Sequence, residues 1–229
     1  MRRLLPDRLS NMRDIGGIIT RSGRRIAEHV FVRSNLPLGL SEAHMSFLLE
    51  KGLHTVIDLR SDAELALQRS DLSDPRFDYH HIPLTGADRP KSEEQIAPGY
   101  LKMLGDSPSI ASALTAMAYA PAGSIFHCAA GKDRSGVLAM ILLLLADAYT
   151  EDIIADYQLS YVFIQDEILQ HRKQFPDLPT WVGQSKMEYM EQTLSMFKAR
   201  YETIETYLEV IGLSPGLIAR LLIKLFGES

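Results

Sequence analysis

The sequence has a single cysteine, a single tryptophan and no excess of positive charge. One cysteine excludes an intramolecular disulfide and is typical of a reducing compartment. A net charge of −5 argues against nucleic acid or an anionic membrane as a general partner. The longest apolar run, 137–146, is too short to span a bilayer, and residues 1–7 contain no apolar stretch of signal-peptide length. We therefore expect a cytoplasmic protein without a transmembrane segment.

The length and the hydrophobic content of the chain are sufficient for a full hydrophobic core. With 229 residues and 46% hydrophobic content, the chain is long enough for one domain covering 1–229. Patterning predicts strands at 15–20, 25–32, 55–58, 77–82 and 123–127. It predicts helices at 42–50 behind the cap Ser41, at 93–104, at 108–118, at 151–163 behind Thr150 with a further segment to 174, and behind Ser214 with Pro215 at the first position. This order predicts an α/β core with an all-helical C-terminal third.

The cysteine lies in the run Phe-His-Cys-Ala-Ala-Gly-Lys-Asp-Arg-Ser-Gly at 126–136, and five residues separate Cys128 from Arg134. An apolar strand precedes this run, and an apolar helix starting near Arg134 follows it. Such spacing lets the backbone N–H groups of 129–134 curl around an anion while the arginine fork faces the same centre. The helix N-terminus adds partial positive charge. The run therefore predicts a loop that binds a tetrahedral phosphate.

The residue types in this loop suggest separate roles. Cys128 is the candidate nucleophile, and Arg134 is placed to grip two phosphate oxygens. Phosphate binding is assigned to Ala129, Ala130, Gly131, Lys132, Asp133 and Arg134. His127 neighbours the nucleophile along a strand, so it points to the opposite face and is expected to orient the loop. Ser135 can hydrogen-bond the sulfur. No metal or cofactor is required.

The loop resembles that of bacterial cysteine-dependent tyrosine and phosphoinositide phosphatases, which read His-Cys-x-x-Gly-Lys-Asp-Arg-[Ser/Thr]-Gly. Further likenesses occur in the family's order: Asn-Met-Arg-Asp-Ile-Gly-Gly at 11–17, Arg-Ser-Asn-Leu at 33–36, Val-Ile-Asp-Leu-Arg at 56–60 and Ile-Ala-Asp-Tyr at 154–157. The resemblance implies a central, mostly parallel sheet flanked by helices. It also implies metal-independent hydrolysis through a phosphocysteine, with phosphotyrosine protein as substrate and phosphoinositide or dual-specificity activity as an extension.

The general acid is less certain from sequence. Some tyrosine phosphatases take the acid from a mobile Trp-Pro-Asp loop. This chain lacks that motif, because its single tryptophan, Trp181, is followed by Val182 and Gly183. Asp133 is the first candidate, since some relatives use that position, and Asp88 is the second. A role for Asp133 in bracing the loop stays open.

Local positive charge could still attract an anionic substrate. The candidates are Arg13, Arg60, Lys132 and Arg134. Arg60 lies beside Asp58, Asp62 and Glu64, so we assign it a structural ion pair. Lys132 adds a charge at the mouth of the loop, and related lipid phosphatases with Gly-Lys-x-Arg loops act on inositol phosphates.

An apolar stripe with spacings of three and four predicts one helix over 187–211, about 35 Å long at 1.5 Å per residue. We interpret it as packing on the core; a dimer seam and a lid are the alternatives. Residues 161–212 could form a helical insertion or lid of the sort some relatives carry, with Trp181 as its anchor or as an ordinary buried side chain.

Two other functions use a similar element. A rhodanese-like sulfurtransferase also has a cysteine loop between strand and helix, although with one residue fewer before the arginine. An inactive phosphopeptide-binding module would normally lack the cysteine or the arginine, and this chain has both.

Overall fold

The computed structural model describes residues 3–5, 7–85 and 90–227. In these residues a central sheet has the order β1-β2-β5-β3-β4. β1 pairs antiparallel with β2, and the other neighbours are parallel. The strands are β1 (Arg13–Asp14), β2 (Phe31–Ser34), β3 (Leu53–Asp58), β4 (Asp78–His81) and β5 (Gly123–His127). The predicted α/β class with a mostly parallel sheet is confirmed.

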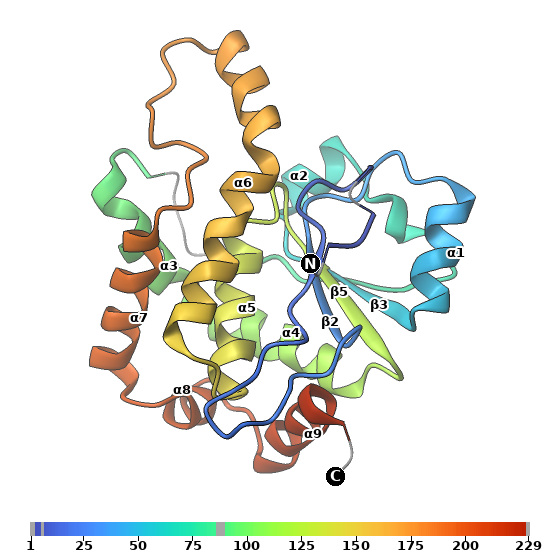
Figure 1. Ribbon diagram of the computed structural model, residues 1–229, viewed down its shortest axis with the longest axis vertical. Coiled ribbons are helices and arrows are strands. Elements are labelled where there is room, and N and C mark those ends of the chain that lie inside the picture. Colours follow the sequence, from blue (N-terminus) through green and yellow to red (C-terminus); the bar gives the residue numbers. More distant parts are fainter. Residues whose placement is uncertain (1–2, 6, 86–89, 228–229) are drawn as a thin grey trace.

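Helices alternate with these strands and then form the last third of the chain (Figure 1). The first group is α1 (Glu42–Glu50), α2 (Asp62–Leu67), α3 (Ile96–Leu104), α4 (Ser107–Tyr119) and α5 (Arg134–Leu145), with short 3₁₀ turns at Asp71–Ser73 and Glu93–Gln95. The second is α6 (Thr150–Gln174), α7 (Met187–Tyr201), α8 (Ile204–Val210) and α9 (Pro215–Phe226). The all-helical C-terminal third is thereby confirmed.

Each face of the sheet is covered because side chains alternate along the strands. Val32, Val56 and Ile125 belong to a smaller cluster that includes Leu48 of α1. Phe126, one residue further along β5, belongs to the larger cluster under α3, α4 and α5. The carboxyl ends of β2, β3 and β5 therefore lie at one edge of the sheet, between the two packed layers. Open α/β sheets bind their ligands at this edge.

The apolar stripe packs on this larger cluster. Met190, Phe197, Tyr201, Ile204 and Leu208 are all buried in it. The core interpretation is thus confirmed, but the single long helix is wrong: α7 ends at Tyr201 and α8 begins at Ile204. Glu202 has a φ of 63°, outside helical values, and the Thr203 hydroxyl accepts a hydrogen bond from the Thr206 N–H.

Two predicted strands near the start of the chain are also wrong in extent. Residues 15–20 form only an isolated bridge, from Ile19 to Arg25, and the strand expected at 25–32 is the shorter β2. Gly16 explains the break: a Cβ there would lie 2.3 Å from the Ala27 carbonyl oxygen. The chain therefore folds tightly on itself before it joins the sheet.

Cap predictions had mixed outcomes. Ser41 and Ser214 cap α1 and α9 as expected, and Pro215 opens α9. Thr150 does not cap its helix; it is the first residue of α6, and Tyr149 precedes it without a side-chain cap. α6 then runs without interruption to Gln174, so the separate segment predicted after 163 is part of one helix.

Candidate active site

The cysteine loop lies between β5 and α5, as predicted. β5 ends at His127, residues 128–133 form the loop, and α5 begins at Arg134. Gly131 has a φ of 69°, and a Cβ there would lie 2.5 Å from the Asn35 backbone nitrogen. Only glycine fits at this position, because the loop turns in a left-handed conformation directly against the end of β2.

Four consecutive carbonyls of the loop, at 129–132, accept hydrogen bonds from residues outside it. The Leu36 N–H donates to the carbonyl of 129 at 2.9 Å, and Asn11 Nδ2 donates to those of 130 and 131 at 2.8 and 3.0 Å. Arg33 Nη2 donates to the carbonyls of 131 and 132, both at 2.9 Å. In a trans peptide the next N–H points away from the carbonyl. The N–H groups of 130–133 therefore face the inside of the loop, where an anion would bind.

Two buried arginines keep this support in place. Arg33 Nη1 donates to Asp156 Oδ2 at 2.6 Å, and Arg13 Nε donates to Asp156 Oδ1 at 2.9 Å. Arg13 Nη1 also donates to Asn11 Oδ1 at 2.6 Å, which turns the Asn11 amide nitrogen toward the loop. Arg13 is 1% exposed, so it is a structural side chain under the loop and not a surface charge that could attract substrate.

Cys128 lies at the base of the loop and is 2% exposed. Its Sγ is 3.7 Å from Ser135 Oγ, in the first turn of α5. The structure thus brings together the predicted nucleophile and the hydroxyl predicted to hydrogen-bond it. α5 directs the positive end of its dipole at the same point.

Arg134 is oriented by Glu64 of α2, a residue that sequence reasoning had placed beside Arg60. Arg134 Nη1 and Nη2 donate to the two Glu64 carboxylate oxygens at 2.6 and 2.7 Å. This bidentate pair lowers the pKa of Glu64 to about 2. Hydrogen bonds from Ser61 act in the same direction, and burial opposes them. The Nε–H and the remaining Nη2 hydrogen form the free fork of Arg134.

The place of Glu64 at a helix start is readable from sequence, but its pairing with Arg134, 70 residues away, is not. Ser61 and Glu64 form a reciprocal capping box at the start of α2, with the Ser61 N–H donating to Glu64 Oε2 at 2.9 Å. The Ser-x-x-Glu pattern is a known helix-start signal. Arg60 instead donates to Asp58 through Nε and Nη2, at 3.0 and 2.6 Å, and is 1% exposed. Its predicted structural role is confirmed.

Lys132 and Asp133 form a paired charge at the loop's edge. Lys132 Nζ lies 2.7 Å from Asp133 Oδ1, and the Tyr100 hydroxyl donates to the same carboxylate oxygen. Burial raises the pKa of Asp133, but the charge and hydrogen bond of Lys132, then Tyr100 and Arg134, lower it below its ordinary value. Lys132 is 7% exposed, and the charge of Asp133 raises its pKa despite burial. Without substrate, Asp133 is therefore a carboxylate.

Comparison with known protein families agrees with this geometry. The model of the tyrosine phosphatase family matches residues 6–227. The chain belongs to the tyrosine phosphatase family. A tyrosine-protein phosphatase of Nostoc commune is 30% identical over 222 residues, which cover 87% of this chain and 75% of that protein. A sequence-predicted tyrosine-protein phosphatase of Cupriavidus necator is 28% identical over 222 residues, 88% of this chain and 81% of its own length.

His127 of this phosphatase points away from the nucleophile, as expected. Its Nε2 lies 3.7 Å from Asp58 Oδ2, on the opposite side of β5, and the residue is fully buried. Burial lowers the pKa of His127 to about 4, despite the opposing charge of Asp58. The imidazole is therefore neutral near pH 7.

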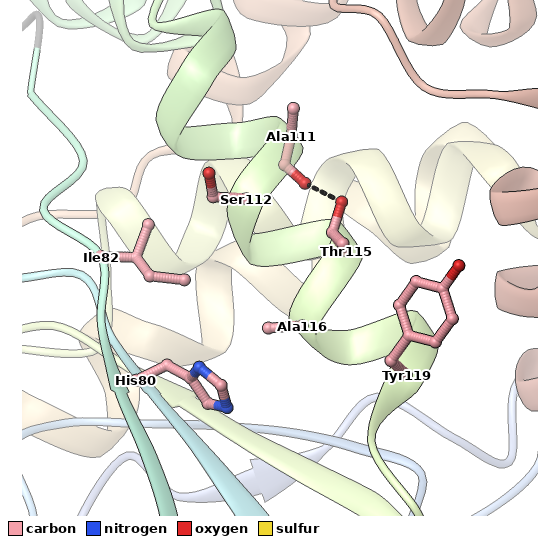
Figure 2. Close-up of a pocket in the computed structure, with 7 residues that line it drawn as sticks. All are labelled: His80, Ile82, Ala111, Ser112, Thr115, Ala116 and Tyr119. Atoms are coloured by element: carbon pink, nitrogen blue, oxygen red, sulfur yellow. Dashed lines mark hydrogen bonds between the residues drawn. The ribbon is translucent and has the colours of Figure 1, made fainter.

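The remaining site candidates are placed as follows. Asp88, the second choice of acid, lies outside the described residues. A cavity of about 470 Å³ lies between β4 and α4, but no residue of the phosphatase loop lines it (Figure 2). In it the Thr115 hydroxyl donates to the Ala111 carbonyl of its own helix. The Nε2 of His80, which also lines the cavity, lies 2.9 Å from Oδ2 of Asp78, a residue outside the cavity. This cavity offers little to a phosphate.

We expect Glu64→Gln to lower kcat/KM by about tenfold or more, since losing the charged bidentate contact lets Arg134 leave its orientation. KM for an aryl phosphate should rise, as measured by steady-state kinetics. Ser61→Ala is the matched control, because it removes the cap, worth about 1 kcal/mol of stability, and keeps the Glu64 carboxylate. Equal kinetics for the two variants would show that Glu64 serves only the helix.

Proposed function

We propose that this tyrosine phosphatase works without a metal ion, through a phosphocysteine intermediate on Cys128. The observation that carries the proposal is the set of four outward-held carbonyls at 129–132, which leaves the N–H groups of 130–133 to bind phosphate. Cys128 lies at the base of this loop and Arg134 at the start of the following helix.

In the proposed reaction the Cys128 thiolate attacks phosphorus, forming the S–P bond as the P–O bond to the leaving group breaks. The loop N–H groups and the free fork of Arg134 stabilise the charge on the equatorial oxygens. Water then attacks phosphorus, releasing inorganic phosphate and the thiolate. The Ser135 hydroxyl stabilises that leaving thiolate by donating a hydrogen bond.

Asp133 is the proposed proton donor to the leaving oxygen. Lys132 and Tyr100 stabilise its charged form and lower its pKa, so it holds no proton near pH 7 until a further negative charge comes close. A bound phosphate brings negative charge beside it, and a like charge raises the pKa of a carboxyl group. Substrate itself would thus prepare the acid.

For the substrate we propose phosphotyrosine in proteins, with dual-specificity or phosphoinositide hydrolysis as a further activity. Support for the second comes from Lys132, whose ammonium lies next to the loop and could reach a second phosphate. The tyrosine phosphatase family match makes the sulfurtransferase alternative unsupported. A turnover assay separates the proposed enzyme from an inactive phosphopeptide-binding module, because only the enzyme would release phosphate.

We expect hydrolysis of p-nitrophenyl phosphate without added metal, at a rate that excess EDTA leaves unchanged. The described residues contain no group of three His, Cys, Asp or Glu side chains arranged to hold a metal ion. Colorimetric assay after exhaustive dialysis against EDTA measures this. Loss of activity that Mg²⁺ or Zn²⁺ restores would contradict the proposed mechanism. None of the described helices has the length and apolarity to cross a membrane.

A further inference from the structure

One arginine outside the loop organises the chain that covers its edge. Arg172, near the end of α6, donates to four backbone carbonyls: Leu178 at 3.2 Å, Pro179 at 3.1 Å, Thr180 at 2.6 Å and Val182 at 3.1 Å. Nη1 makes the first of these contacts and Nη2 the other three, so the two hydrogens of Nη2 are shared among three carbonyls. Arg172 therefore gathers the carbonyls of the 178–182 turn around one guanidinium.

The 178–184 segment, which includes this turn, is anchored at two other points. Gly183 has a φ of 86° and packs on Ile168 of α6, where a Cβ would lie 2.6 Å from the Ile168 Cδ1. Trp181 packs against the main hydrophobic cluster. Figure 1 shows α6 continuing beyond the core, with the chain returning beside it to α7. Of the 161–212 stretch predicted as an insertion or lid, this returning part comes to the phosphatase loop.

The contact with the loop is made through Lys132. Its Nζ donates to the Gln184 carbonyl at 3.0 Å and lies 2.7 Å from Asp133 Oδ1. The Lys132 side chain is only 9% exposed, and its ammonium already has two partners, the Gln184 carbonyl and Asp133. Because an ammonium has three hydrogens, a ligand that carries a second phosphate must displace the Gln184 carbonyl to gain more than one hydrogen bond from Lys132. A ligand with one phosphate need not.

We propose that Arg172 is a positioning residue that selects the ligand class. By holding the 178–184 segment on the site, it keeps Lys132 occupied and favours singly phosphorylated ligands over polyphosphorylated ones. The inference rests on the proposed role of residues 128–134 as the phosphate site. Arg172 acts through Gln184 and Lys132 and does not itself touch substrate.

Binding, measured apart from turnover, tests this. In a Cys128→Ser background, isothermal titration calorimetry with phenyl phosphate and with a soluble inositol trisphosphate gives two dissociation constants. Adding Arg172→Ala should tighten the inositol trisphosphate by about tenfold relative to phenyl phosphate, because a released ammonium gains a charged hydrogen bond. Lys173→Ala removes a neighbouring exposed charge on α6 and should leave both constants unchanged.

A double-mutant cycle distinguishes the release of Lys132 from a general loss of order in the 178–184 segment. The selective gain should vanish when Lys132→Met is combined with Arg172→Ala. Equal change for both ligands, or a gain that survives Lys132→Met, would overturn the inference. Should Arg172→Ala fail to fold, Arg172→Lys keeps the charge but loses the planar fork, and it should release Lys132 in part.

The outcome also separates this inference from the proposed function. A wild-type protein without Cys128-dependent turnover, whose Cys128→Ser form still shows the expected selectivity, would refute the phosphocysteine mechanism alone. A Cys128→Ser form that binds neither phosphate ligand would overturn both proposals.

Discussion

We expect Cys128→Ser to abolish measurable turnover of p-nitrophenyl phosphate and phosphotyrosyl peptide and to leave phosphate or vanadate binding in place. Serine is nearly the same size, so the outward carbonyl contacts of the loop persist and the inward N–H groups keep their directions. What is lost is the nucleophile, since a serine hydroxyl is a far weaker nucleophile than a thiolate near neutral pH. Turnover assays and calorimetry with phosphate measure the two effects.

Arg134→Ala is the paired variant, and we expect it to lose both turnover and phosphate binding. Its fork contributes a bidentate charged contact, so about 2–4 kcal/mol of transition-state stabilisation should disappear, a decrease of roughly 30- to 1,000-fold in kcat/KM. Phosphate binding falls as well, partly because Glu64 is left without its partner. Near-normal turnover in Cys128→Ser would rule out a covalent intermediate on this residue.

If Asp133 protonates the leaving group, we expect Asp133→Asn to slow hydrolysis of phosphotyrosyl peptide by roughly 10²–10⁴-fold and to have little effect on p-nitrophenyl phosphate. A phenoxide with an ordinary pKa needs a proton as it leaves, whereas p-nitrophenoxide leaves as the anion. The alkaline limb of kcat should also disappear, because that limb reports the deprotonation of the acid in the enzyme–substrate complex.

The same variant separates the two roles that Asp133 could have. Tyr100→Phe is the matched control: it removes the hydroxyl that donates to Asp133 and keeps the ring and the carboxyl group. By removing a stabiliser of the carboxylate it should raise the pKa of Asp133 and move the alkaline limb to higher pH. If Asp133→Asn slowed both substrates equally, Asp133 would brace the loop through Lys132, and the search for the acid would move to Asp88.

Strong local signals explain the elements that could be predicted. The strand at 123–127 and the helix at 42–50 behind Ser41 were predicted to the residue, because an apolar run or a side-chain cap within a few residues determines them. The strands at 15–20 and 25–32 were not, since β-branched content alone says nothing of the backbone contact between Gly16 and Ala27. The helix break at Glu202 escaped the periodicity argument because the apolar stripe continues across it.

The sequence by itself determined the composition of the phosphate loop, its place between strand and helix, and the identities of Cys128 and Arg134. These depend on residues within one short stretch, where local geometry leaves few alternatives. Only the tertiary structure decided which groups contact the loop, among them three side chains and the backbone carbonyl of Gln184. Asn11, Arg33, Glu64 and Gln184 reach it across separations of 119, 98, 70 and 52 residues. The sequence shows no periodicity or fixed spacing that predicts such contacts, because they form only after the sheet and α6 have packed.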